Sequence, residues 1–193
     1  MGARYLLIRS PNPDPDGPNK TMWGAEQKEW LKKTLLASDA DFRVLVSPDC
    51  IVGPGGDPDR AVFQLPGGGA DSQGDGGFAH EGREFRYWVR DNKIKNLIVV
   101  NGDRHWQYHS IDPETGLNEF SCGAVAEKHA AESIPVSPKY HFVRKGSGFV
   151  TVEIEGTMQN PRLVVAIHKP GGQVLHQEFF SREGLVRAAA PPA

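Results

Sequence analysis

Two stretches of the chain repeat their apolar side chains with the 3.6-residue period of a helix. Residues 21–38 carry one such stripe, which includes Trp23, Trp30 and Leu35, and we expect both tryptophans to lie in the core. An acidic residue in the first turn suits the helix dipole. Residues 78–92 carry a second apolar stripe. The pattern therefore predicts two amphipathic helices.

Short apolar runs predict strands in the rest of the chain. The runs at 42–47 and 97–100 are rich in β-branched residues, as expected of strands that are buried on both faces. With the second helix between them they make a βαβ unit, in which the two strands are parallel. Further strands are predicted at residues 4–8, 107–111, 117–122, 148–154, 163–168 and 174–180. The last three form an antiparallel meander, and we expect its histidines, His168 and His176, to be structural.

Glycine and proline mark the connections. Residues 9–19 contain four prolines, which exclude a helix or a central strand. Residues 50–77 form an irregular stretch that is much longer than a typical βα loop of ~2–6 residues. Residues 123–137 predict a short helix or a loop. We expect one domain over residues 1–183, followed by a disordered tail at 184–193.

Composition limits the classes of partner. The chain has 193 residues and a net charge of −2, so it lacks the basic surface typical of proteins that bind nucleic acids or anionic membranes. Its apolar runs are shorter than the ~20 residues of a membrane span, and its amino-terminal run is too short for a signal peptide. We therefore expect a soluble protein. Cys50 and Cys122 form no metal-binding pair, and buried free thiols are expected for both.

The candidate chemistry is concentrated just after the run at 97–100. Asp103 and His105 follow the strand end, where ligands bind in open α/β sheets. Because they are two residues apart in an extended segment, both side chains point to the same side, as in half of a divalent-metal site. The alternative is that Asp103 caps a turn and His105 is an ordinary loop residue. The position at a strand end favours the metal site.

Two other residues are candidates for binding phosphate. His80 lies at the start of the second predicted helix, where free amide groups attract anions, and its imidazole is placed to act as a general acid. A capping or packing role is the alternative. Arg9 follows the first predicted strand, where it either faces an anionic substrate or forms a surface salt bridge.

Three segments in order resemble the PhoD-type alkaline phosphatases of the metallophosphoesterase clan. They are MWGAEQKEWLKKTLLASDADFRVLVSP, GFAHEGREFRYWV and NGDRHWQYHSIDPETGLNEFSCG. In that family the GDxH segment after a strand supplies metal ligands for phosphate-ester hydrolysis, so the resemblance implies this role for Asp103 and His105. It further implies a Ca, Fe, Zn or Mn ion as cofactor. Arg104 or Arg9 would then neutralise phosphoryl oxygens, and His109 would contribute to binding.

The resemblance covers only the later half of the family's catalytic domain. The chain has no Gly-Asp pair at a strand end before residue 96 and no Gly-Asn-His segment, which supply the clan's earlier ligands. The expected fold is α/β, a partial metallophosphoesterase-like sandwich of βαβ units with a carboxyl-terminal antiparallel β meander. Cys122, near a family cysteine, is a candidate for the periphery of the site.

Two hypotheses about function follow from this partial match. The first is a metal-dependent hydrolase of phosphate esters, weakened by the loss of the amino-terminal ligand motifs. The alternative is a catalytically inactive half-domain that acts as a structural or self-associating module. Because half of a sheet leaves an open edge, we expect a homodimer in either case. Relatives in the family are often exported, so the cellular location stays open.

Overall fold

The computed structural model describes residues 16–53, 78–102, 104–131, 134 and 136–186. The predicted strand at 4–8, most of the irregular stretch at 50–77, Arg9 and Asp103 lie outside these residues. The elements are α1 (Ala25–Ala37), β1 (Arg43–Ser47), α2 (Ala79–Asp91), β2 (Leu97–Asn101), β3 (Trp106–Ile111), β4 (Asn118–Cys122), the 3₁₀ turn η1 (Glu127–His129), β5 (Tyr140–Lys145), β6 (Phe149–Thr157), β7 (Asn160–His168), β8 (Val174–Ser181) and β9 (Gly184–Val186).

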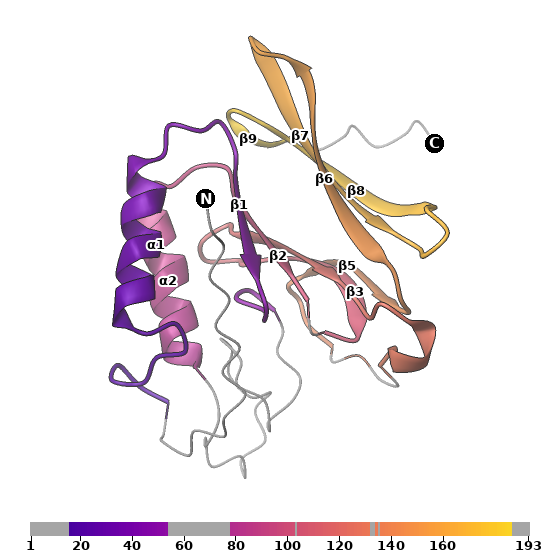
Figure 1. Cartoon of the computed structure of the whole chain (residues 1–193), viewed down its shortest axis with the longest axis horizontal. Helices are drawn as coiled ribbons and strands as arrows, with labels where there is room; N and C mark the ends of the chain where they lie inside the picture. The colour runs from indigo at the N-terminus through magenta and orange to yellow at the C-terminus, as the bar shows by residue number, and fades with distance from the viewer. Residues whose placement is uncertain (1–15, 54–77, 103, 132–133, 135, 187–193) are drawn as a thin grey trace.

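The elements form layers (Figure 1). Helices α1 and α2 lie side by side against one face of a five-stranded sheet, in the order β1-β2-β4-β3-β5, and a four-stranded sheet, β6-β7-β8-β9, lies on the other side. Strands β1, β2 and β4 are parallel, whereas β3 is antiparallel to both β4 and β5. The second sheet is antiparallel throughout. This architecture confirms the predicted α/β sandwich with a βαβ unit and a terminal meander.

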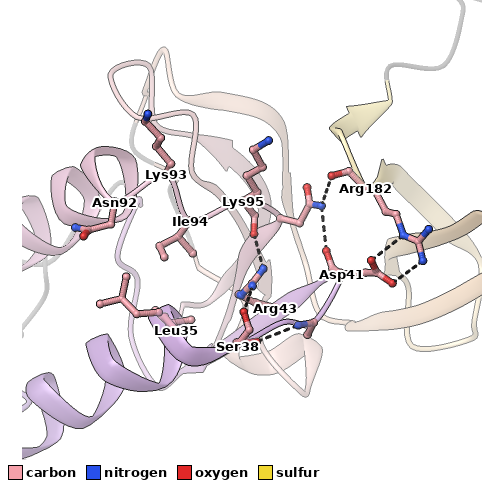
Figure 2. A pocket seen from close by; sticks show the side chains of 12 residues that line it. Leu35, Ser38, Asp41, Arg43, Asn92, Lys93, Ile94, Lys95 and Arg182 are labelled. Atoms are coloured by element: carbon pink, nitrogen blue, oxygen red, sulfur yellow. Dashed lines mark hydrogen bonds and ion pairs between the residues drawn. The ribbon is translucent and has the colours of Figure 1, made fainter.

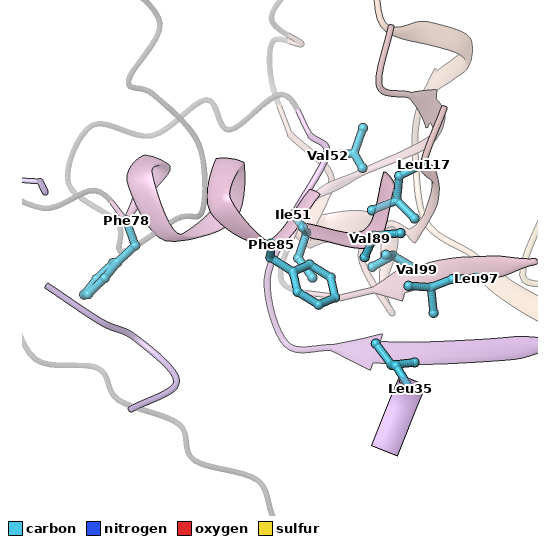
Figure 3. Packing of buried hydrophobic residues seen from close by; sticks show 9 residues of the cluster. All are labelled: Leu35, Ile51, Val52, Phe78, Phe85, Val89, Leu97, Val99 and Leu117. Atoms are coloured by element: carbon cyan, nitrogen blue, oxygen red, sulfur yellow. The ribbon is translucent and has the colours of Figure 1, made fainter. Parts of the chain in front are cut away.

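Alternation along the strands divides the core in two. Leu97 and Val99 of β2 face the helices and join a cluster with Phe85 and Val89 of α2 (Figure 3). Ile98, between them, faces the other way and packs with residues of the second sheet. The central strands are thus apolar on both faces, which explains their unbroken hydrophobic runs.

Helix α1 differs from its prediction because it begins later. It begins at Ala25, after Gly24, whose φ is +75°, so Trp23 precedes the helix and does not follow its period. Trp23 packs edge-on against Phe85 with ring centroids 5.0 Å apart, whereas Trp30 is 60% exposed. The expectation that both tryptophans lie in the core is therefore wrong for Trp30.

Two strands were not predicted. Tyr140–Lys145 forms β5 at the edge of the first sheet, and Gly184–Val186 forms β9 beside β8, within the stretch expected to be a tail. Cys50 is buried, Cys122 is half-buried, and both are free thiols, as expected. Within the described ranges, the structure contains no helix with the length and apolar character needed to cross a bilayer.

Candidate functional site

The three parallel strands end at one edge of the first sheet. The register aligns Ser47 of β1 with Asn101 of β2, and Asn101 with Ser121 of β4. The segments that follow these strands therefore meet at this edge, which we call the carboxyl edge. Gly102, Arg104 and His105 follow the end of β2 at this edge, and in open α/β sheets ligands bind outside the carboxyl ends of the strands.

A buried ion pair joins the segments after β1 and β2. The Arg104 guanidinium donates from Nη2 to Oδ1 of Asp49 at 2.6 Å, and both residues are buried. The same oxygen accepts the backbone N–H of Cys50 at 2.7 Å. Burial alone would lower the pKa of Arg104. The neighbouring acidic groups raise this pKa by more than burial lowers it, so the guanidinium stays charged. Arg104 thus points into the protein rather than toward solvent, where a phosphoryl group would enter.

A second buried network lies on the helix-facing side of the carboxyl edge. Glu119 of β4 accepts the backbone N–H groups of Ile51, Val52 and Gly53 at 2.6, 2.9 and 2.8 Å. It also accepts the Tyr108 hydroxyl at 2.8 Å. One carboxylate therefore fixes the chain that leaves β1 and orients a tyrosine from β3.

The tyrosine in turn orients Asn101. Its hydroxyl proton is donated to Glu119, so its oxygen accepts from Nδ2 of Asn101, at 2.7 Å. This arrangement directs Oδ1 of Asn101 away from the tyrosine. Although this oxygen is buried, it has no hydrogen-bond partner among the described residues. A buried acceptor without a donor is costly, and it is a suitable ligand atom for a hard cation.

His105 is half-buried at the carboxyl edge, and Asp103 lies outside the described residues. The His105 carbonyl accepts the N–H of Ala131 at 2.7 Å, which brings the η1 segment beside it. The ring of His129 lies 6.5 Å from the ring of His105, centroid to centroid. His129 is exposed and was not predicted as a site residue, since nothing in the sequence pairs it with His105.

His80 is exposed at the first turn of α2. Its backbone N–H donates to the Asp16 carboxylate at 3.0 and 3.2 Å, so an anionic group already occupies this helix terminus. The next residue, Glu81, is buried and accepts the backbone N–H of Met22 at 2.7 Å. These contacts tie α2 to the segment before α1, while the imidazole of His80 stays accessible.

His109 does not lie with the other candidates. It follows Tyr108 on β3, so its side chain points to the opposite face of the sheet. There it is fully buried and stacks on Phe120, with ring centroids 4.2 Å apart. Its neighbours include His176 and Glu178 of β8, in the second sheet.

A pocket of about 390 Å³ lies at the opposite end of the parallel strands (Figure 2). Several of its polar groups bond to one another. The carboxylate of Asp41 pairs with Arg182 at 2.7 and 3.0 Å, and Asn96 donates to the carbonyl oxygens of both residues. We therefore assign this pocket to the joint between the two sheets rather than to the chemistry.

The comparisons with known proteins agree with this architecture. The family model of the PhoD-like phosphatases matches residues 8–158 of the chain. No curated protein matches it in sequence. The solved structure of PhoD has a TM-score of 0.56 and 16% identity, and the match covers 90% of this chain and 36% of that one.

A second solved structure shares the fold. It is GAP50, described as the anchor in the inner membrane complex of Plasmodium, with a TM-score of 0.53 and 17% identity over 79% of this chain and 41% of that one. The chain therefore spans less than half the length of either structure. Because the family model covers the elements from α1 to β6, the chain belongs to the PhoD-like phosphatase family.

Proposed function

We propose that the carboxyl edge hydrolyses phosphate esters with a metal ion held by Asp103 and His105. The observation that carries this proposal is the buried Oδ1 of Asn101, which has no hydrogen-bond partner among the described residues and lies directly before the Gly-Asp-Arg-His segment. Membership of the PhoD-like phosphatase family supports the reaction class.

The donor set fits a metal ion. An amide oxygen and a carboxylate suit Ca²⁺ or Mn²⁺, and an imidazole adds affinity for Fe or Zn²⁺. When bound, such an ion lowers the pKa of its water toward ~7 and polarises the phosphoryl oxygens. Asn101, Asp103 and His105 together supply ligands for one ion, so we expect these residues to hold a single ion.

The surrounding residues have separate roles in this proposal. Arg104 acts as a positioning residue, because its pairing with Asp49 at 2.6 Å fixes the residue that separates Asp103 from His105 in the sequence. His80 is accessible at the start of α2 and serves as the general acid toward the leaving group. Arg9 is the remaining candidate for neutralising the phosphoryl oxygens.

The test is hydrolysis of p-nitrophenyl phosphate and of its bis-ester, with and without added Ca²⁺, Mn²⁺, Zn²⁺ or Fe. We expect metal-stimulated turnover that falls at least about 100-fold in Asp103→Ala and His105→Ala, since each removes a ligand. Asp39→Ala is the matched control, because this exposed carboxylate precedes β1 at the opposite end of the sheet. Turnover that is unchanged in both ligand variants would refute the assignment.

The second candidate function is a non-catalytic, self-associating module. Strand β1 ends the order of the first sheet among the described residues, and its Val44 and Val46 are 42% and 64% exposed. An open edge with apolar side chains favours pairing with another chain, and a symmetric homodimer would cover it.

Light scattering coupled to size-exclusion chromatography separates the oligomeric states. We expect a dimer at micromolar concentration, which Val46→Lys converts to a monomer by placing a charge on the open edge. Thr34→Lys, on the exposed side of α1, is the control. A wild-type chain that elutes as a monomer would rule the homodimer out.

A further inference from the structure

The geometry points to a second metal site, of the zinc class, held by His109, His176 and Glu178 between the two sheets. The ligand atoms come from β3 of the first sheet and β8 of the second, so a bound ion would link the sheets directly. The site lies on the face of β3 opposite Tyr108 and is separate from the carboxyl edge. The inference does not depend on the proposed hydrolysis.

The spacing of the three atoms matches tetrahedral coordination. Nδ1 of His109 lies 3.0 Å from Nε2 of His176 and 3.5 Å from Oε1 of Glu178, and the last two atoms are 3.3 Å apart. Zinc binds nitrogen and oxygen at ~2.0–2.1 Å, so the ligand atoms of a tetrahedral ion are separated by ~3.3–3.4 Å. The three atoms thus form one face of such a tetrahedron without any rearrangement.

A neighbouring amide sets the tautomer that metal binding requires. Nε2 of His109 lies 2.9 Å from Oδ1 of Asn118, whose Nδ2 donates to the Gly116 carbonyl at 2.9 Å. Because the amide presents its oxygen, Nε2 of His109 carries the proton and Nδ1 presents its lone pair to the site. Such outer contacts orient histidine ligands in known metal sites.

Aromatic rings hold both imidazoles in place. His109 stacks on Phe120 with an interplanar angle of 6°, and His176 stacks on Phe142 with an angle of 10°. In β8, His176 and Glu178 are two residues apart, so both point to the same side of the strand. The ligands are thus positioned before an ion arrives, which reduces the entropy lost on binding.

The site has one carboxylate and one open side. Glu178 is the acidic member of the three and supplies the negative charge through Oε1, the atom that lies 3.5 Å from His109 and 3.3 Å from His176. The His109 side chain is fully buried, whereas those of His176 and Glu178 are 17% and 19% exposed. Two of the three ligand side chains are therefore in contact with solvent, which suits a zinc site with three protein ligands and a water.

The test is direct binding of Zn²⁺ to the full chain after removal of metals with a chelator. We expect stoichiometric binding in the His105→Ala variant, which disables the carboxyl edge and so isolates the second site. In that background, His176→Ala or Glu178→Gln should weaken Zn²⁺ binding more than about 100-fold, and Asn118→Ala about 10–100-fold. His168→Ala is the matched control, since this β7 histidine bonds to Thr151 instead.

Co²⁺ supplies a readout that reports geometry rather than affinity. Four-coordinate Co²⁺ gives intense visible absorption bands, which we expect in the His105→Ala background and not after His176→Ala. Zn²⁺ should also raise the melting temperature in that background, because the ion links the two sheets. A chain that binds no Zn²⁺, or binding that survives both ligand substitutions, would overturn the inference, whatever the outcome of the hydrolysis assays.

Discussion

Replacing Glu119 tests whether one buried carboxylate holds the candidate site together. Its Oε2 accepts the N–H groups of Ile51 and Val52, and its Oε1 accepts that of Gly53 and the Tyr108 hydroxyl. In Glu119→Gln the new amide group takes the position of one oxygen. The hydroxyl adapts by rotating, but the Gly53 N–H then faces another donor.

We therefore expect Glu119→Ala to lose more stability than Glu119→Gln. One buried N–H without a partner costs ~1–3 kcal/mol, which is our expectation for Glu119→Gln. Glu119→Ala leaves three N–H groups and a hydroxyl without an acceptor and opens a cavity. Hydrogen bonds to a charged acceptor contribute ~1.5–3 kcal/mol each, but the segment after β1 relaxes and admits water, so we expect a loss of ~3–5 kcal/mol.

Urea unfolding followed by circular dichroism measures these losses. With a denaturant slope of about 2 kcal/mol/M, the midpoint should fall by about 0.5–1.5 M in Glu119→Gln and about 1.5–2.5 M in Glu119→Ala. Glu153→Ala, at an exposed position of β6, should change stability by less than about 0.5 kcal/mol. If both Glu119 variants unfold within about 0.5 kcal/mol of the wild type, the network does not hold the site as argued.

Three further predictions concern thiols, pH and packing. Burial raises the pKa of the Cys50 thiol well above its usual value and raises that of Cys122 less, so a thiol reagent at pH 8 should label Cys122 first and Cys50 only on unfolding; rapid labelling of Cys50 in the folded chain would contradict its burial. Burial raises the pKa of Glu84, but hydrogen bonds from two α1 lysines outweigh this and lower it overall. The stability lost in Glu84→Gln should therefore be constant near neutral pH and disappear as the pH falls below 4.5, through the lowered pKa, in urea midpoints measured across that range; a loss that persists at low pH would exclude the ionic contribution. A methyl group at Gly148 would overlap a β7 carbonyl oxygen, so Gly148→Ala should cost ~1–3 kcal/mol in thermal unfolding, whereas Gly171→Ala, which has open space around it, should cost almost nothing; equal effects would refute the clash.

The sequence correctly predicted the elements in which the apolar positions of the pattern are also the buried positions. Strands β1 and β2 and helix α2 lie within one or two residues of their predicted bounds, because each packs apolar side chains against the core. Strand β5 was missed because burial alternates along it, whereas polar and apolar residues do not alternate in step with burial. Its exposed positions include Val143, and its inward positions include Arg144, which donates to Gln107 at 2.8 Å. A partly buried hydrogen bond of this kind takes the place of the apolar contact that pattern analysis expects.

The site was harder to predict because its partners are distant in the chain. Arg104 was singled out for its charge, but its partner, Asp49, lies 55 residues earlier, so its burial could not be inferred from the segment itself. His176 was expected to be structural because its strand is an ordinary meander. Only the packing of the two sheets brings it to His109, 67 residues away. Strand ends and spacing indicate where chemistry is placed, whereas tertiary contacts decide which side chains take part.

The register of β3 connects the two candidate centres. Tyr108 belongs to the network under the carboxyl edge and His109 to the cluster between the sheets, and a shift of one residue would exchange their faces. The turn between β3 and β4 sets this register. Asp112 accepts the Gly116 N–H at 2.8 Å and donates its own N–H to Leu117 at 2.9 Å, and Gly116 has a φ of +74°, which disfavours any other residue. This short turn therefore sets the face on which Tyr108 contacts Asn101. It also sets the face on which His109 meets His176 in the proposed zinc site.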